Sequence, residues 1–271
     1  MARTNRFSPA PSAHAAWSWL AAGALLGALW AMLQWAPAVW LQRAAAAASN
    51  GRVRLDDSRG TLWQGSALLS LGGGPGSLDA SRLPGRVQWE LHPQLAASGL
   101  RLDIRLHADC CTPQPLELAL APGWGGWRLQ LGDATSTWPA AVLAGLGTPW
   151  NTVQLQGPLQ LQTAGLRMES AAERLQIEGA LTLDLPNLAS RLSTLRPLGS
   201  YRLQLQGGAQ PVVALQTLQG ALQLNGDGRW TAGRLRFEGE ARADAAHEAE
   251  LSNLLNIMGR REGVRSVITL G

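Results

Sequence analysis

The sequence contains no lysine, one tyrosine, two phenylalanines and four histidines, and only 15% of its 271 residues are charged. Without lysine, the chain can form neither a Walker-type phosphate loop nor a Schiff-base nucleophile. The histidines are scattered, and no HExxH motif or His/Cys ligand cluster occurs. We therefore expect a protein that is not an enzyme, with no catalytic residue, no cofactor and no metal site.

Two pairs of adjacent residues could carry chemistry, and neither is predicted to do so. Cys110 and Cys111 are the only cysteines, and a disulfide between neighbours closes a strained small ring. We expect two small, largely inert residues. Asp56 and Asp57 would face opposite sides of a strand and could not act as a carboxylate dyad, so a solvated turn is the expectation for them.

Every one of the 23 basic residues is arginine, and the net charge is only +4. The arginines are interspersed with leucine, glutamine and acids rather than gathered on one face. Nucleic-acid binding requires such a gathered basic face. We predict no nucleic-acid partner.

An uncharged apolar run extends from Ala15 to Ala36. As a helix, its roughly 22 residues would span about 33 Å, enough to cross the core of a bilayer. A cleaved signal peptide is the alternative, because 44–48 offers small-residue cleavage sites, but the run is longer than the usual signal-peptide core. The sequence predicts an uncleaved anchor. Tryptophans at both of its ends are expected at the membrane interfaces: Trp17, Trp19, Trp35 and Trp40.

The charges around this run predict its orientation. Arg3 and Arg6 precede it with no acid between them and the run, which favours an N-terminus in the cytoplasm. We therefore predict a cytoplasmic segment over 1–14, a transmembrane anchor over 15–41 and an exported β-rich domain over 42–271.

The exported part alternates apolar and polar residues with a period of two, which is typical of half-buried strands. A loop is expected at 72–77, and a short helical or linker stretch at 44–50. Strands are expected at 53–55, 65–71, 87–91, 100–106, 116–120, 127–131, 153–161, 175–185, 201–205, 218–224 and 235–243.

Three short helices are expected between these strands. Thr137 and Pro139 would begin a helix that runs to Leu146 and ends at Gly147. A second is predicted over 186–195. The third covers 248–258, with a stripe of apolar residues on one face and a glycine at its end: Leu251, Leu254, Leu255, Met258 and Gly259.

Glycine recurs between apolar residues in positions that face inward: Gly65, Gly157, Gly179, Gly220 and Gly239. A strand without a side chain at that position can bend. We therefore expect a mainly β fold, in which long, continuous, kinked strands form a curved antiparallel sheet shaped as a trough, sandwich or flattened barrel.

Several motifs resemble the type II secretion system protein N family, also called general secretion pathway protein N, and the likeness covers essentially the whole chain. They are Gly60-Thr61-Leu62-Trp63-x-Gly65, Val87-x-Trp89-x-Leu91-x-Pro93, Leu198-Gly199-x-Tyr201-x-Leu203, Gly220-x-Leu222-x-Leu224-x-Gly226 and a closing Leu254-Leu255 helix that ends at Gly259-Arg260. The N-terminal anchor completes the set.

The resemblance implies a non-enzymatic, single-pass protein of the inner membrane of a Gram-negative bacterium. Its periplasmic domain would contact other type II secretion proteins, of the inner-membrane platform or the pseudopilus. The strand pattern is also similar to that of AsmA-like envelope proteins, whose curved sheets form grooves for lipid. A lipid-binding or lipid-bridging groove, with phospholipid as a partner, is therefore the alternative function.

Overall fold

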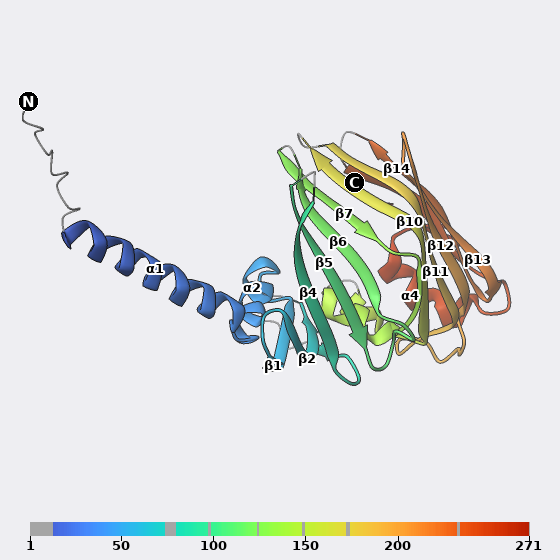
Figure 1. The fold of residues 1–271 in the computed structure, drawn as a ribbon. Helices are drawn as coiled ribbons and strands as arrows, with labels where there is room; N and C mark the ends of the chain where they lie inside the picture. Colours follow the sequence, from blue (N-terminus) through green and yellow to red (C-terminus); the bar gives the residue numbers. More distant parts are fainter. Residues whose placement is uncertain are drawn as a thin grey trace, which may run out of the picture.

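The computed structural model describes residues 13–73, 80–96, 99–123, 125–147, 150–171, 174–231 and 234–270. Helix α1 (Ala13–Gln34) projects from a β-rich body, and helix α2 (Val39–Ala48) lies where the two meet (Figure 1). None of the helices in these residues combines the length and apolar character needed to cross a membrane. Arg3 and Arg6, with most of the predicted segment 1–14 and of the predicted loop 72–77, lie outside the described residues.

The body is one 17-stranded sheet, and its paired strands run antiparallel. The strands are β1 (Val53–Gly60), β2 (Gln64–Gly72), β3 (Ala80–Arg82), β4 (Val87–Ala96), β5 (Gly99–Ala108), β6 (Leu116–Gly123), β7 (Gly126–Leu131), β8 (Ala134–Pro139), β9 (Leu155–Gln156), β10 (Pro158–Ala171), β11 (Arg174–Ser190), β12 (Gly199–Gly208), β13 (Val212–Gly220), β14 (Leu222–Thr231), β15 (Arg234–Ala243), β16 (Arg260–Glu262) and β17 (Arg265–Leu270).

Successive strands pair almost throughout, so the sheet is a long meander. From β4 to β7 each strand pairs with the next, and β7 and β8 lie end to end along β10. The order then continues through β11, β12, β13, β14 and β15 to β17. The short strands β3, β9 and β16 add to β2, β11 and β17. Figure 1 shows that the sheet is strongly curved, as the sequence predicts for a mainly β fold.

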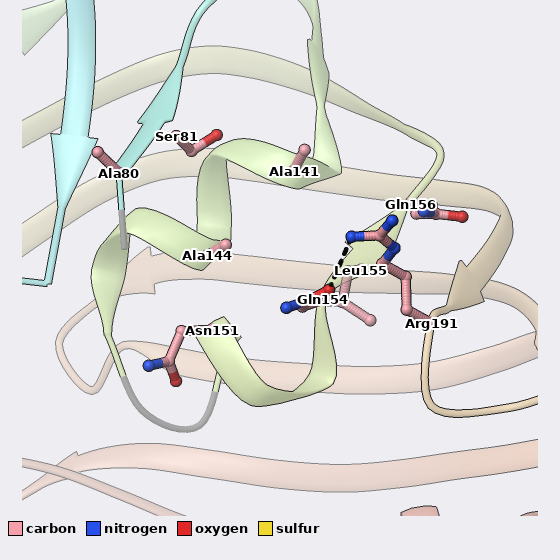
Figure 2. Close-up of a pocket in the computed structure, with 9 residues that line it drawn as sticks. All are labelled: Ala80, Ser81, Ala141, Ala144, Asn151, Gln154, Leu155, Gln156 and Arg191. Carbon is pink, nitrogen blue, oxygen red and sulfur yellow. Dashed lines mark hydrogen bonds between the residues drawn. The ribbon is translucent and has the colours of Figure 1, made fainter. Parts of the chain in front are cut away.

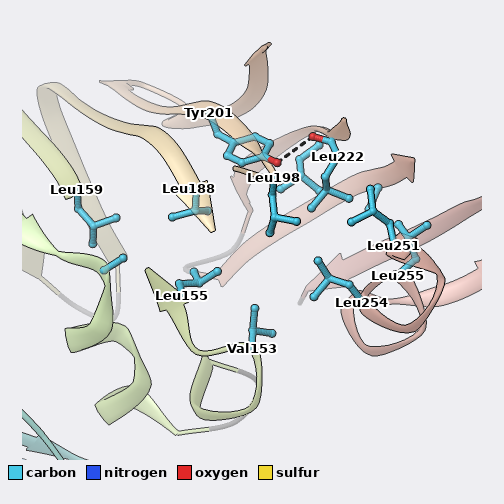
Figure 3. Packing of buried hydrophobic residues seen from close by; sticks show 13 residues of the cluster. Val153, Leu155, Leu159, Leu188, Leu198, Tyr201, Leu222, Leu251, Leu254 and Leu255 are labelled. Carbon is cyan, nitrogen blue, oxygen red and sulfur yellow. Dashed lines mark hydrogen bonds between the residues drawn. The ribbon is translucent and has the colours of Figure 1, made fainter. Parts of the chain in front are cut away.

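The main core lies between the inner face of this curve and three short helices, η1 (Ala140–Leu146), α3 (Trp150–Val153) and α4 (Glu248–Met258). Figure 3 shows leucines of the strands meeting those of α4. The prediction of a helix over 248–258 is confirmed, and Leu251, Leu254 and Leu255 are buried as its apolar stripe predicts.

The other two predicted helices differ from the structure. Thr137 and Pro139 belong to strand β8, and a 3-10 helix begins only at Ala140, although it ends before Gly147 as expected. The helix predicted over 186–195 is wrong. Residues to Ser190 continue strand β11, because their backbone pairs with β12 and β9, partners that the local sequence does not reveal.

Two predicted strands are interrupted. The strand expected over 153–161 consists of the end of α3, then β9, Gly157 and the start of β10. The strand expected over 218–224 consists of the end of β13, a bend at Ala221 and the start of β14. Gly157 and Gly220 have φ angles of 128° and 130°, so both lie at strand ends rather than inside a continuous strand.

Cys110 and Cys111, expected as small inert residues, are joined by a disulfide. They lie in the turn after β5 and not in a strand, so the alternation of side chains along a strand does not separate them. Cys111 is buried in a small cluster with Leu83 and Ala108.

Candidate functional site

The first candidate site is the loop Gly60–Gly65, which connects β1 to β2 and contains the most specific of the sequence motifs. Gly60 has a φ of 89°, and a Cβ atom there would lie 2.5 Å from the carbonyl oxygen of Gln64. The Thr61 amide donates to this same carbonyl at 2.8 Å, and the Gln64 amide donates to the Thr61 hydroxyl at 3.1 Å. These bonds close a tight turn.

This loop forms hydrogen bonds with the chain segment that follows helix α1. The Trp63 indole nitrogen donates to the carbonyl of Leu33 at 2.7 Å, and the Leu62 amide donates to the carbonyl of Ala36 at 2.7 Å. In return, the Ala38 amide donates to the carbonyl of Gly60 at 3.2 Å. Leu33 lies in the last turn of α1, where carbonyls lack their usual helical partner, and besides the Trp63 indole its carbonyl accepts a longer bond from the Ala36 amide at 3.4 Å. We call these contacts, between residues 33–38 and 60–65, the joint.

Trp89 of β4 supports the joint from beneath. Its indole nitrogen donates to the carbonyl of Leu62 at 3.1 Å, and its side chain is 2% exposed. Gly65 pairs with Trp89 across the strands, and a Cβ at Gly65 would lie 2.5 Å from the ring. The ring therefore occupies the space that a side chain at position 65 would fill. Trp89 belongs to a small core with Ala38 and Leu55.

Ion pairs fix the strand that leads into the joint. Asp57 interrupts the pairing of β1 with a φ of 48° and accepts hydrogen bonds from Arg86 and Arg59, both at 2.8 Å. The bond from Arg86, followed by that from Arg59, holds the pKa of the Asp57 carboxyl below its usual value. Arg86 also donates to the backbone carbonyl of Ser66 at 3.1 Å. Asp57, expected in a solvated turn, is thus the partner of two arginines at a bulge in a strand.

A second motif region surrounds Tyr201 of β12 (Figure 3). Its hydroxyl donates to the carbonyl of Leu222 at 2.9 Å, and burial raises the pKa of the hydroxyl above its ordinary value. Gly199 lies under this side chain, since a Cβ there would be 2.7 Å from the hydroxyl oxygen. Gly199 pairs with Gly220 across the strands. The tyrosine thereby ties β12 to the first residue of β14.

The remaining predicted glycines lie in two further arrangements. Gly226 and Gly239 pair across β14 and β15, and a Cβ at Gly226 would lie 2.5 Å from the Phe237 ring. Gly179 has a φ of 83° where the pairing of β10 with β11 shifts register, and a Cβ there would clash with the Gly165 carbonyl. No signal in the sequence links any of these glycines to its partner, because the register between strands is not visible locally.

The predicted interface tryptophans lie on or near α1. Trp17, Trp19 and Trp35 are exposed, and Trp40 lies on α2 with about half of its surface exposed. The structure does not bring these tryptophans together with the motif residues of the sheet. Among the described residues, no group of three or more His, Cys, Asp or Glu side chains could hold a metal ion. The contacts of the joint hold the end of α1 against the loop between β1 and β2.

Residues 51–267 match the family described as Type II secretion system (T2SS), protein N. The chain belongs to this family. The membership expected from the motifs is thus confirmed, and it gives the protein a role in type II secretion. The matched region includes the loop of the joint but not the segment 33–38 to which the loop is hydrogen-bonded. The comparisons with curated proteins and with solved structures find no match.

Proposed function

We propose that this protein is a non-enzymatic accessory component of the type II secretion system. In this proposal, segment 15–41 anchors the chain in the inner membrane with its N-terminus in the cytoplasm. The β-body lies in the periplasm and contacts other secretion proteins, of the inner-membrane platform or the pseudopilus. The joint is the observation that carries the proposal, because its hydrogen bonds connect the apolar segment directly to the sheet.

Helix α1 supports the anchoring part of the proposal. It contains no Asp, Glu, Lys or Arg, most of its residues are apolar, and its few polar residues do not gather on one face. A helix of that kind requires an apolar environment on every side, either a protein core or a membrane. Leu20, Leu25 and Leu29 are each at least 65% exposed, so the body of this chain does not provide that environment.

The proposal is tested by deleting the protein and measuring export of a type II substrate. We expect export to fall, and to recover when the wild-type chain is supplied. Photocrosslinking from the outer face of the sheet, for example from Gln130, should capture platform or pseudopilus subunits. Alkaline phosphatase fused after residue 271 should be active only if the body is periplasmic. Unchanged export together with no captured subunit would defeat the secretion role.

The alternative, lipid binding, rests on uncovered apolar residues of the face that carries the core. Strand register places four of them on this face near the hairpin ends of β4–β5 and β6–β7. They are Leu95, Leu100, Leu120 and Trp127, and their exposed fractions range from 91% at Leu95 to 37% at Leu120. Exposed apolar groups that adjoin one another are typical of ligand or membrane contacts.

Native mass spectrometry of the full-length protein tests the alternative. A lipid-binding face should retain phospholipid during purification, and Leu120→Glu should reduce the retained amount. Leu218→Glu, at an exposed leucine of strand β13, is the matched control. A wild-type protein that carries no phospholipid removes the support for this function.

A further inference from the structure

A cavity of about 280 Å³ lies among β3, η1, α3, β9 and the end of β11 (Figure 2). One part of its wall is apolar and small, formed by Ala141, Ala144 and Leu155. Another part is polar and carries Gln154, Gln156 and Arg191. No carboxylate lines the cavity among the described residues, so Arg191 is its charged group.

The backbone around Arg191 is held firmly. Ala189 and Ser190 pair with Gln156 and Leu155, and the Arg191 amide donates to the carbonyl of Gln154 at 3.4 Å. The buried hydroxyl of Ser190 donates to the carbonyl of Val153 at 2.5 Å. The arginine therefore projects from a fixed point at the edge of the cavity. Arg191 is exposed, so its guanidinium is accessible to a ligand that enters the cavity from solvent.

The guanidinium of Arg191 has N–H donors that form no hydrogen bond with the described residues. Its one hydrogen bond among the described residues runs from Nη1 to the neutral side-chain oxygen of Gln154 at 3.3 Å, and no carboxylate lies beside it in the cavity wall. A guanidinium carries five N–H donors in a planar fork that matches a carboxylate. Gln154 itself has a φ of 45°, which is costly for a residue other than glycine. Such backbone conformations occur often at ligand sites.

We propose that this cavity binds a carboxylate carried on a short apolar stem, with the carboxylate on Arg191 and the stem against Ala141, Ala144 and Leu155. One guanidinium balances one negative charge, whereas a phosphate monoester at neutral pH carries nearly two. The volume lies at the small end of ligand sites, about 300 to 1,000 Å³, and admits only a small group. The ligand is therefore a free short-chain carboxylic acid or the C-terminal residue of a polypeptide.

The proposal is tested by calorimetric titration of the full-length protein in detergent. The probes are hexanoate, hexanol, inorganic phosphate, acetyl-Ala-Ala-Leu and the amide of that peptide. We expect hexanoate or the peptide acid to bind, and hexanol and the peptide amide to bind at least tenfold more weakly, since a charge-assisted hydrogen bond is lost. Binding of the peptide acid without hexanoate indicates a polypeptide C-terminus, and the reverse indicates a free acid.

Arg191→Gln should weaken binding at least tenfold, whereas Arg196→Gln, an exposed arginine five residues further on, should leave it unchanged within about twofold. Ala144→Leu fills the apolar part of the cavity and should abolish binding while the protein keeps its melting temperature. This second variant tests the proposal even if the arginine variant does not fold. Three outcomes would overturn the proposal: no carboxylate binds, hexanol or phosphate binds as tightly as hexanoate, or Arg191→Gln binds like the wild type. The readout is binding alone, so it is independent of the secretion role.

Discussion

At the scale of single residues, several glycines of this chain accommodate aromatic side chains. Gly65 lies beneath Trp89, Gly226 beneath Phe237, and Gly199 beneath Tyr201. An aromatic ring over a glycine buries a large apolar surface and shields the bare backbone from water. The sequence identifies which glycines face inward, but the ring that covers each one depends on strand register and could not be predicted.

The joint provides a direct test of this packing. Gly65→Ala puts a Cβ within 2.6 Å of both the Trp89 ring and the Arg59 carbonyl, so the ring or the strand must move. We expect the free energy of unfolding to fall by about 1 to 3 kcal/mol, as in other overpacked cores. Gly123→Ala in β6 is the control, because its new Cβ would meet its nearest neighbour at an ordinary 3.7 Å. Urea denaturation with equal losses in both variants would contradict the packing argument.

Gly179 tests a different constraint, that of backbone conformation. Its φ of 83° lies in the region that side chains rarely adopt, and the Gly165 carbonyl occupies the space beside it. We expect Gly179→Val to lower the free energy of unfolding by about 1 to 3 kcal/mol, because a β-branched residue must leave this conformation. The measurement is the melting temperature, and an unchanged value would show that the bulge tolerates a side chain.

At the scale of elements, helix α4 is the part that the sequence predicts best, because its apolar period is local. Leu254 is 1% exposed and packs between the helix and the sheet. Leu254→Ala should lower the free energy of unfolding by about 2 to 5 kcal/mol through lost burial and the cavity left behind. Val264→Ala, at a 61% exposed position, should change it by less than about 0.5 kcal/mol. Chemical denaturation of both variants checks the contrast.

The pair of strands β11 and β12 carries a pH-dependent contact. Arg202 donates to both carboxylate oxygens of Asp184, at 2.6 and 2.8 Å, and these bonds hold the pKa of Asp184 below its ordinary value. Because the carboxyl has the lower pKa in the folded state, the pair stabilises the fold at neutral pH. That contribution disappears as the pH falls below the unfolded value of about 3.9 and through the folded one.

We therefore expect Asp184→Asn to lower the free energy of unfolding by about 1 kcal/mol at pH 7 and by less at pH 3. Glu117→Gln is the control, since its side chain is 68% exposed and lies 3.4 Å from its partner Arg105. Urea denaturation at the two pH values measures the difference. A loss of the same size at both values would mean that the charge of Asp184 contributes nothing.

The elements that could not be predicted from the sequence share one physical cause. Residues 186–190 have helix-compatible local signals, yet their backbone hydrogen bonds are completed by β12 and β9, which lie elsewhere in the sequence. Strands β16 and β17 likewise form by pairing with each other and with β15. Strand pairing is a tertiary interaction that overrides local propensity. Helix α4 could be predicted because its backbone hydrogen bonds lie within the helix.

At the scale of the whole molecule, the sequence predicts a curved antiparallel sheet and an apolar N-terminal segment, but not how they connect. The connection depends on a contact between residues about 30 positions apart, the Trp63 indole and the Leu33 carbonyl. The direction of α1 relative to the sheet is set by three hydrogen bonds, two of which form the antiparallel bridge between Pro37 and Thr61. Movement or force at one part would therefore pass to the other through the joint.

Trp63→Phe tests this coupling because it removes the indole donor and keeps an aromatic ring. The loss of one partly exposed hydrogen bond should cost about 1 kcal/mol or less, so the sheet should unfold almost as before. The Leu33 carbonyl loses its bond from the β1–β2 loop and keeps only the longer one from the Ala36 amide, so the angle of α1 should vary more widely. Pulsed electron paramagnetic resonance between spin labels at positions 26 and 130 of the full-length chain measures the distance distribution, which we expect to broaden. Trp127→Phe, remote from the joint, should leave it unchanged, and a narrow distribution in both variants would mean that Trp63 does not orient the helix.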